Sequence, residues 1–193
     1  MAEILVDLKV GVPVKSPILD VRVIALYKGK EPGPFDYLQG MRSGILRALG
    51  NPEETEVARR YHRREQEFFE LLSQKVPGPV TAVLSPPSDF AWQAEPYREA
   101  IKRKFPNAID LTPAMTRPGQ FRAGKGATVD QVVSGLSYQP QGTENGIEQL
   151  VIVDDTFTTG TTAAAIVLLL REHGLPEECD VILACPLWLD TVT

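Results

Sequence analysis

Apolar and polar residues alternate along residues 3–10, which is the pattern of a strand with one buried face. Residues 21–27 form a second predicted strand, which is rich in β-branched residues, and a segment rich in Gly and Pro closes it. Apolar residues then recur at helical spacing over 35–49 and, among many charges, over 53–75. The N-terminal part therefore predicts strands and helices that do not alternate regularly.

From residue 79 onward the pattern changes to strands that alternate with helices. Short apolar runs, each typical of a strand buried on both faces, occur at 80–84, 108–111, 150–153 and 181–184. Helical patterns cover 94–105 and 161–173, whereas 112–149 is long and rich in Gly, Pro, Gln, Ser and Thr. This alternation predicts an α/β core over 79–193, a doubly wound and mostly parallel sheet with helices on both faces. Residues 1–78 are expected to form a strand and helix appendage, or hood, on the same globule.

The composition suits one globular domain and disfavours several classes of protein. Hydrophobic residues make up 43% of the 193 residues, which is enough to bury a full core. The longest apolar run, 163–170, is far shorter than the ~20 residues that cross a bilayer, so we expect no membrane span. The N-terminus has no basic segment followed by an apolar one, which predicts a cytoplasmic address. The net charge of −5 argues against nucleic-acid binding.

The turn after the run at 150–153 carries most of the candidate chemistry. Two adjacent acids, Asp154 and Asp155, follow the predicted strand directly, and the next helix begins at about Thr161. The small and hydroxyl-bearing residues at this turn are Thr158, Thr159, Gly160, Thr161 and Thr162. Small residues let backbone N–H groups turn inward, and a helix N-terminus adds further donors. Because ligands of open α/β sheets bind at the carboxyl ends of strands, this turn predicts a phosphate site.

The two acids need a different partner from the phosphate, because like charges repel each other. Sugar hydroxyls or a cation would suit them. A ribose 5-phosphate satisfies both halves of the site, with its phosphate at the threonines and its 2- and 3-hydroxyls donating to Asp154 and Asp155. The alternative is that Asp154 and Thr158 only cap the helix, but one cap does not explain two adjacent acids beside a cluster of threonines.

Residues 151–162, Val-Ile-Val-Asp-Asp-Thr-Phe-Thr-Thr-Gly-Thr-Thr, resemble the phosphoribosyl-pyrophosphate motif of type I phosphoribosyltransferases. In that superfamily, apolar strand residues lead into two acids, two spacers and then Thr-Thr-Gly-x-Thr or a close variant. The sequence departs from the pattern at Thr156 and Phe157, where small or branched aliphatic residues are usual. The order of parts over 79–193 is most similar to ComF-type proteins, although the N-terminal third lacks the cysteine zinc motif that those proteins often carry.

The resemblance implies a role for each part of the chain. Asp154 and Asp155 would hold the ribose hydroxyls, and residues 158–162 would hold the 5-phosphate. The loop at the position of the family's pyrophosphate loop consists of Ser85, Pro86, Pro87 and Ser88. The cations of a mobile catalytic flap, which would meet the pyrophosphate when the flap closes, are Arg117, Arg122 and Lys125. For the loop and the flap, a plain surface loop is an alternative of equal weight.

The implied activity is transfer of the phosphoribosyl group to a nitrogen acceptor, such as a nucleobase or an amine, with release of pyrophosphate. The implied cofactor is Mg²⁺ held through the substrate and not directly by the protein, and a homodimer is implied because many relatives form one. The alternative is a regulatory protein that binds phosphoribosyl pyrophosphate or a nucleotide without chemistry. Neither Gly-x-Ser-x-Gly nor a P-loop sequence is present, which disfavours a hydrolase of that type or a P-loop kinase.

Overall fold

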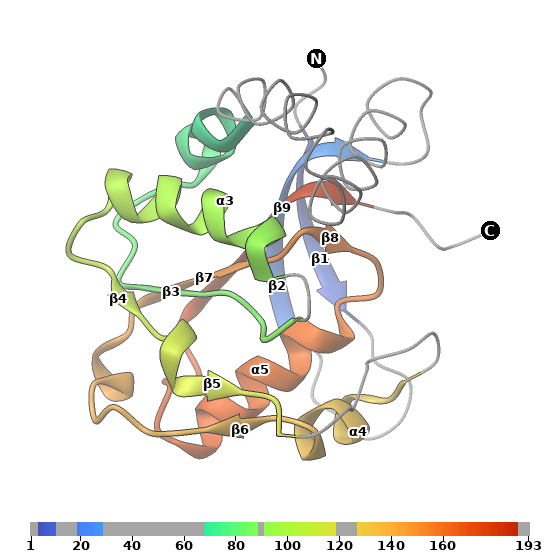
Figure 1. Cartoon of the computed structure of the whole chain (residues 1–193), viewed down its shortest axis with the longest axis vertical. Coiled ribbons are helices and arrows are strands. Elements are labelled where there is room, and N and C mark those ends of the chain that lie inside the picture. Colours follow the sequence, from blue (N-terminus) through green and yellow to red (C-terminus); the bar gives the residue numbers. More distant parts are fainter. Residues whose placement is uncertain (1–3, 11–18, 29–67, 89–90, 119–126, 189–193) are drawn as a thin grey trace, which may run out of the picture.

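A seven-stranded sheet forms the centre of the computed structural model, which describes residues 4–10, 19–28, 68–88, 91–118 and 127–188. The strand order is β1–β2–β9–β7–β3–β4, and β8 pairs with the end of β9 (Figure 1). The strands are β1 (Ile4–Val10), β2 (Leu19–Lys28), β3 (Ala82–Leu84), β4 (Ile109–Asp110), β7 (Gln149–Val153), β8 (Thr156–Phe157) and β9 (Asp180–Trp188). β1 is antiparallel to β2, and the other described pairs in this sheet are parallel. The prediction of an α/β fold with a mostly parallel sheet is therefore confirmed.

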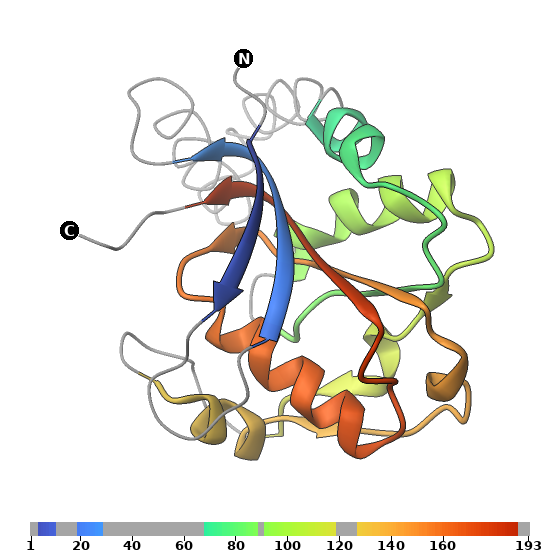
Figure 2. The same cartoon turned by 180° about the vertical axis from the view of Figure 1, so that it is seen from behind.

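The N-terminal strands lie in this central sheet. β2 is placed between β1 and β9, and its residues 22–28 pair in parallel with 182–188 of β9 (Figure 2). The helix predicted over 35–49 lies outside the described residues. Of the helix predicted over 53–75, residues 68–75 are described, and they are helical.

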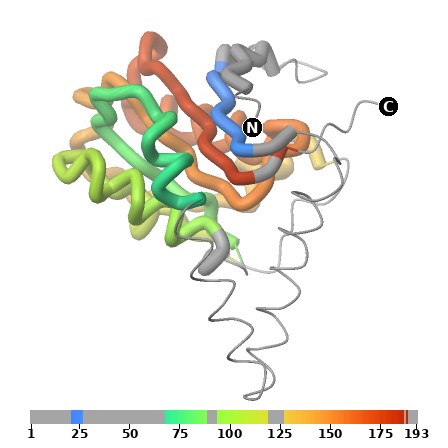
Figure 3. The backbone as a smooth tube through the Cα atoms, turned by 90° about the horizontal axis from the view of Figure 1, so that it is seen from above, coloured from blue at the N-terminus to red at the C-terminus, as the bar shows by residue number. Residues whose placement is uncertain are grey.

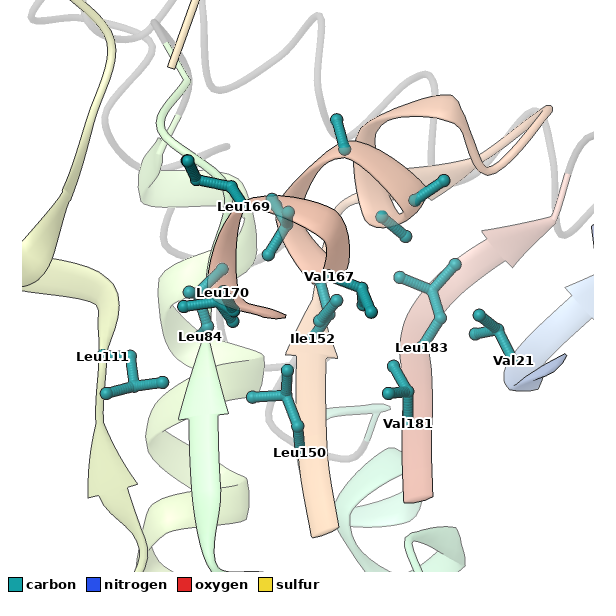
Figure 4. Packing of buried hydrophobic residues seen from close by; sticks show 14 of the residues in the cluster. Val21, Leu84, Leu111, Leu150, Ile152, Val167, Leu169, Leu170, Val181 and Leu183 are labelled. Carbon is teal, nitrogen blue, oxygen red and sulfur yellow. The ribbon is translucent and has the colours of Figure 1, made fainter. Parts of the chain in front are cut away.

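Apolar side chains form one layer on each face of the sheet. Helix α5 (Thr161–Glu172) covers one face and packs against Leu84, Ile152 and Leu183 (Figure 4). Helix α3 (Ala91–Lys104) and helical residues 68–75 cover the other face (Figure 3). The layer beneath them contains the alternate residues of the same strands, among them Val83, Val151 and Ile182. No helix in the described part of the chain is long and apolar enough to cross a membrane.

Several short elements lie within 112–149, a segment whose composition is typical of a loop. They are η2 (Thr112–Ala114), β5 (Met115–Thr116), α4 (Val129–Ser134), β6 (Ser137–Tyr138) and η3 (Glu144–Gly146). β5 and β6 pair as a separate antiparallel sheet. Buried Glu144 anchors its end, because one carboxylate oxygen accepts from Tyr138 Oη at 2.5 Å and from the Gln141 N–H at 2.6 Å. Thr128 and Gln131 form a capping box at the start of α4, which is a signal that the sequence carries.

Lys104, at the end of α3, closes the C-terminal end of helical residues 68–75. Its Nζ donates to the backbone oxygens of Ser73 at 3.0 Å, Gln74 at 3.2 Å and Val76 at 2.8 Å. The last carbonyls of a helix have no partner within the helix, and a cation there also suits the negative end of the helix dipole. The two helices on this face are thus tied together by one side chain.

The direction of the chain's connections reverses between the neighbouring strands β3 and β7. From β3 the chain passes through α3 to β4, on one side, whereas from β7 it passes through α5 to β9, on the other. The loops that leave the carboxyl ends of these two strands therefore diverge toward opposite faces of the sheet. Ligands of open α/β sheets bind in the crevice at such a reversal, and here the two loops are 85–88 and 154–160.

Candidate functional site

β7 brings Asp154 to the carboxyl edge of the sheet, on the face that α5 covers. Leu150 and Ile152 lie in the apolar layer under α5, so the alternation of the strand places Asp154 on the same face. The Asp154 N–H donates to the backbone oxygen of Ala184 in β9 at 3.1 Å, which continues the ladder one residue past β7. The backbone at Asp154 is thus fixed by the sheet.

Phe157 anchors the loop that follows. β8 pairs with Leu187 and Trp188 at the end of β9, and the Phe157 side chain is buried there. The Phe157 and Trp188 rings pack edge to face, with their centroids 5.6 Å apart. An aromatic residue at this position of the motif therefore has a packing reason, and the loop next to it leaves Thr158 and Thr159 exposed.

The N-terminus of α5 is open to a ligand. The N-cap residue of α5 is Gly160. Its φ of 75° lies in the left-handed region, which glycine adopts without strain. Among the described residues no side-chain capping hydrogen bond is made at this N-terminus, so neither Asp154 nor Thr158 caps the helix. The Thr159 and Thr161 hydroxyls lie 2.8 Å apart and hydrogen-bond to each other. Capping alone therefore does not account for the polar residues of the loop.

A small hollow that is partly open to solvent lies at this helix end. The residues that line it are Asp154, Thr156, Phe157, Thr158, Thr159, Gly160, Thr161, Thr162, Ala163 and Leu183. One wall thus carries hydroxyls and helix N–H groups, whereas Phe157 and Leu183 contribute an apolar wall. A carboxyl group and the N-terminus of a helix thus share one small hollow.

The Asp154 carboxyl is held in conditions that favour its neutral form. Although the residue keeps part of its surface exposed, burial of the carboxyl raises its pKa to about 8, and the charge of the adjacent Asp155 contributes to the rise. The Asp155 N–H donates to Asp154 Oδ1 at 2.8 Å, which offsets only part of this effect. Burial and the adjacent charge therefore favour the protonated form of Asp154 in the free protein.

The structure does not bring all of the predicted site residues into this hollow. Asp155 is half-buried next to Asp154 but does not line the hollow, and neither does the loop 85–88 at the end of β3. Arg117 directly follows β5, is half-buried and likewise lies away from the hollow's walls. Arg122 and Lys125 lie outside the described residues. The structure thus groups Asp154 with the threonine segment, and the loop 85–88 stands next to them at the neighbouring strand end.

Thr112 is a residue of this region that the sequence reasoning missed. Its Oγ1 accepts a hydrogen bond from the Ser85 N–H at 2.9 Å, which ties the loop after β3 to the chain after β4. The only signal in the sequence was the position of Thr112 just beyond a predicted strand, where hydroxyls of a switch-point loop are expected.

In the described part of the chain, no three His, Cys, Asp or Glu side chains converge as a direct metal site. Comparison with known proteins adds no family assignment. No protein-family model matches the sequence, and no curated protein matches it significantly.

Proposed function

We propose that the hollow at the start of α5 binds the 5-phosphate of phosphoribosyl pyrophosphate. In this proposal the protein has the fold of a type I phosphoribosyltransferase and transfers the phosphoribosyl group to a nitrogen acceptor. The observation that carries the proposal is the meeting of Asp154 with an uncapped helix N-terminus in one cavity. That cavity lies at the reversal of strand order, where α/β sheets bind their ligands.

The two halves of the hollow match the two ends of a ribose 5-phosphate. Backbone N–H groups at the start of α5 and the hydroxyls of residues 158–162 supply donors to the phosphate. Asp154 in the hollow, and Asp155 beside the hollow, would supply acceptors for the ribose hydroxyls once Asp154 has released its proton. The apolar wall formed by Phe157 and Leu183 excludes water from one side of the phosphate, which strengthens the hydrogen bonds made there.

In the proposed reaction, a nitrogen of the acceptor attacks C1 of the ribose. The C1–O bond to pyrophosphate breaks, pyrophosphate leaves with the bonding electrons, and the acceptor nitrogen loses a proton. Positive charge develops on the ribose ring, and the carboxylates at Asp154 and Asp155 would position the ring and stabilise that charge. Adjacent carboxylates also suit a Mg²⁺ ion held through the substrate's oxygens, which would neutralise charge on the pyrophosphate.

The test is a paired substitution, Asp154→Asn with Asp155→Asn, followed by calorimetric titration with ribose 5-phosphate and with phosphoribosyl pyrophosphate. Each charge-assisted hydrogen bond contributes about 1.5–3 kcal/mol, so the loss of two should weaken binding at least ~100-fold. Asp130→Asn is the matched control, because Asp130 is exposed in the first turn of α4 and does not line the hollow. Unchanged affinity in the double variant would refute the site.

A second function, binding without chemistry, draws support from one observation. The half-buried Arg117 does not line the hollow, so the flap cation that lies among the described residues stands apart from the proposed phosphate site. A regulatory protein would need only the hollow. Release of pyrophosphate in the presence of Mg²⁺ and a panel of nucleobases and amines favours the transferase, whereas tight binding without release favours the regulator.

A further inference from the structure

One side chain ties the loop after β3 to the edge of the sheet. The last backbone hydrogen bond between β3 and the chain after β4 runs from the Leu111 N–H to the Val83 oxygen, at 2.9 Å. Beyond it, the Ser85 N–H donates to Thr112 Oγ1, also at 2.9 Å. The threonine hydroxyl thus replaces the backbone acceptor at the point where the ladder ends, and it fixes the first residue of the loop.

Thr112 is itself held in place by Asp110. The Thr112 N–H donates to Asp110 Oδ1 at 3.0 Å, while Asp110 Oδ2 accepts from Lys102 Nζ at 2.9 Å and lies 3.6 Å from Arg98 Nε. Burial acts to raise the pKa of Asp110, but the hydrogen bonds from Lys102 and Thr112 together with the charge of Arg98 outweigh it and lower that pKa. Asp110 therefore remains a carboxylate, and it fixes Thr112 relative to α3.

The loop that Thr112 holds has an unused polar group. Ser85 is 3% exposed, and its Oγ has no hydrogen-bond partner among the described residues. A buried hydroxyl without a partner is unfavourable, because it has lost its hydrogen bonds to water. The next two residues, Pro86 and Pro87, have no backbone N–H to offer. Because the Ser85 N–H already donates to Thr112, the Ser85 hydroxyl is the hydrogen-bond donor that residues 85–87 can still offer to a ligand.

We propose that Thr112 is a positioning residue, which holds the loop 85–88 so that the loop receives the pyrophosphate end of the substrate. The inference rests on the proposed function, in which the 5-phosphate occupies the hollow at α5. β3 and β7 are neighbours with Leu84 paired to Ile152, so their two loops leave the sheet side by side. That arrangement suits a ligand with two anionic ends. The loop and the hollow then act on separate parts of one molecule.

Thr112→Val tests this role, because valine keeps the branched shape and removes only the hydroxyl that holds Ser85. We expect the Kd for phosphoribosyl pyrophosphate to rise about tenfold, the effect of losing roughly one hydrogen bond. The Kd for ribose 5-phosphate should change by less than about twofold, since that ligand lacks the pyrophosphate. Thr112→Ser retains a hydroxyl and should restore wild-type affinity for both ligands.

Thr116→Val is the matched control, because Thr116 is an exposed residue of β5 whose hydroxyl lies 3.5 Å from the Ser137 oxygen, away from the loop. It should leave both affinities unchanged. Thermal unfolding of each variant checks that it folds, and Thr112→Ala replaces the valine variant if that one does not. If the Thr112 variant binds both ligands equally more weakly, Thr112 has a general structural role and the proposal is overturned. Unchanged affinity of that variant for phosphoribosyl pyrophosphate would overturn it as well.

The two proposals fail in different ways. If the wild-type protein binds ribose 5-phosphate but binds phosphoribosyl pyrophosphate no more tightly, the role of Thr112 is refuted while the sugar-phosphate hollow stands. If it binds neither ligand, the proposed function is refuted, and the role of Thr112 with it.

Discussion

Replacing Asp154 by asparagine should stabilise the protein above about pH 5, by an amount that grows with pH. The ordinary pKa of the carboxyl is 3.8, whereas in the folded protein burial and the neighbouring Asp155 raise it to about 8. Between these values the folded protein holds a proton that the unfolded chain has already released. Unfolding therefore releases a proton, and a rise in pH favours the unfolded state. Asparagine does not titrate, and its side-chain oxygen can still accept from the Asp155 N–H.

The size of the effect follows from the one proton involved. The free energy of unfolding changes by up to about 1.4 kcal/mol per pH unit when the two states differ by one bound proton. From about pH 5 to about pH 7 the wild-type protein should thus lose up to about 3 kcal/mol relative to Asp154→Asn. Above the folded pKa of about 8 the difference should level off, because both states are then ionised.

Urea unfolding of both proteins without ligand, at several values between about pH 5 and pH 8, measures this difference directly. The same substitution should weaken binding of ribose 5-phosphate, so that the protein gains stability and loses affinity together. Parallel pH profiles for the two proteins would refute the account of Asp154, since they would mean that its carboxyl ionises in the folded state as it does in the unfolded chain.

Two further substitutions test the packing around the site. Lys104→Met keeps the side-chain stem but removes three hydrogen bonds to the end of helical residues 68–75. The free energy of unfolding, measured with heat or urea, should fall by about 1–2 kcal/mol, and an unchanged value would contradict the role of Lys104. Tyr138→Phe leaves Glu144 buried with fewer donors, and it should lower the free energy of unfolding by about 1.5–3 kcal/mol; a change below about 0.5 kcal/mol would contradict the anchoring role of this pair.

The strands and helices of the core could be predicted from the sequence because their apolar patterns are long and regular. The runs at 80–84, 108–111, 150–153 and 181–184 each coincide with all or part of a strand, and helices occupy most of 94–105 and 161–173. The short elements within 112–149 were not predicted. β5 and β6 have two residues each, too few for any alternation to be visible, and they form because Tyr138 and Met115 reach the buried layer under α5.

The site was predictable only in its local part. Asp154 and the threonines follow one another in the sequence and meet in one hollow because a strand end and a helix start lie a few residues apart. The hydrogen bond from Ser85 to Thr112 joins residues 27 positions apart, and it depends on β3 and β4 being neighbours. The high pKa of Asp154 depends first on burial, which has no local sequence pattern, and only its smaller cause, the adjacent Asp155, is visible in the sequence.

Calorimetric titration of the wild-type protein with phosphoribosyl pyrophosphate, with and without Mg²⁺ and beside ribose 5-phosphate, tests the central claim most directly. We predict that both ligands bind, that phosphoribosyl pyrophosphate binds more tightly, and that Mg²⁺ strengthens its binding. Absence of heat for both ligands, under conditions where the protein is folded, would contradict the assignment of the hollow at α5 to a sugar phosphate.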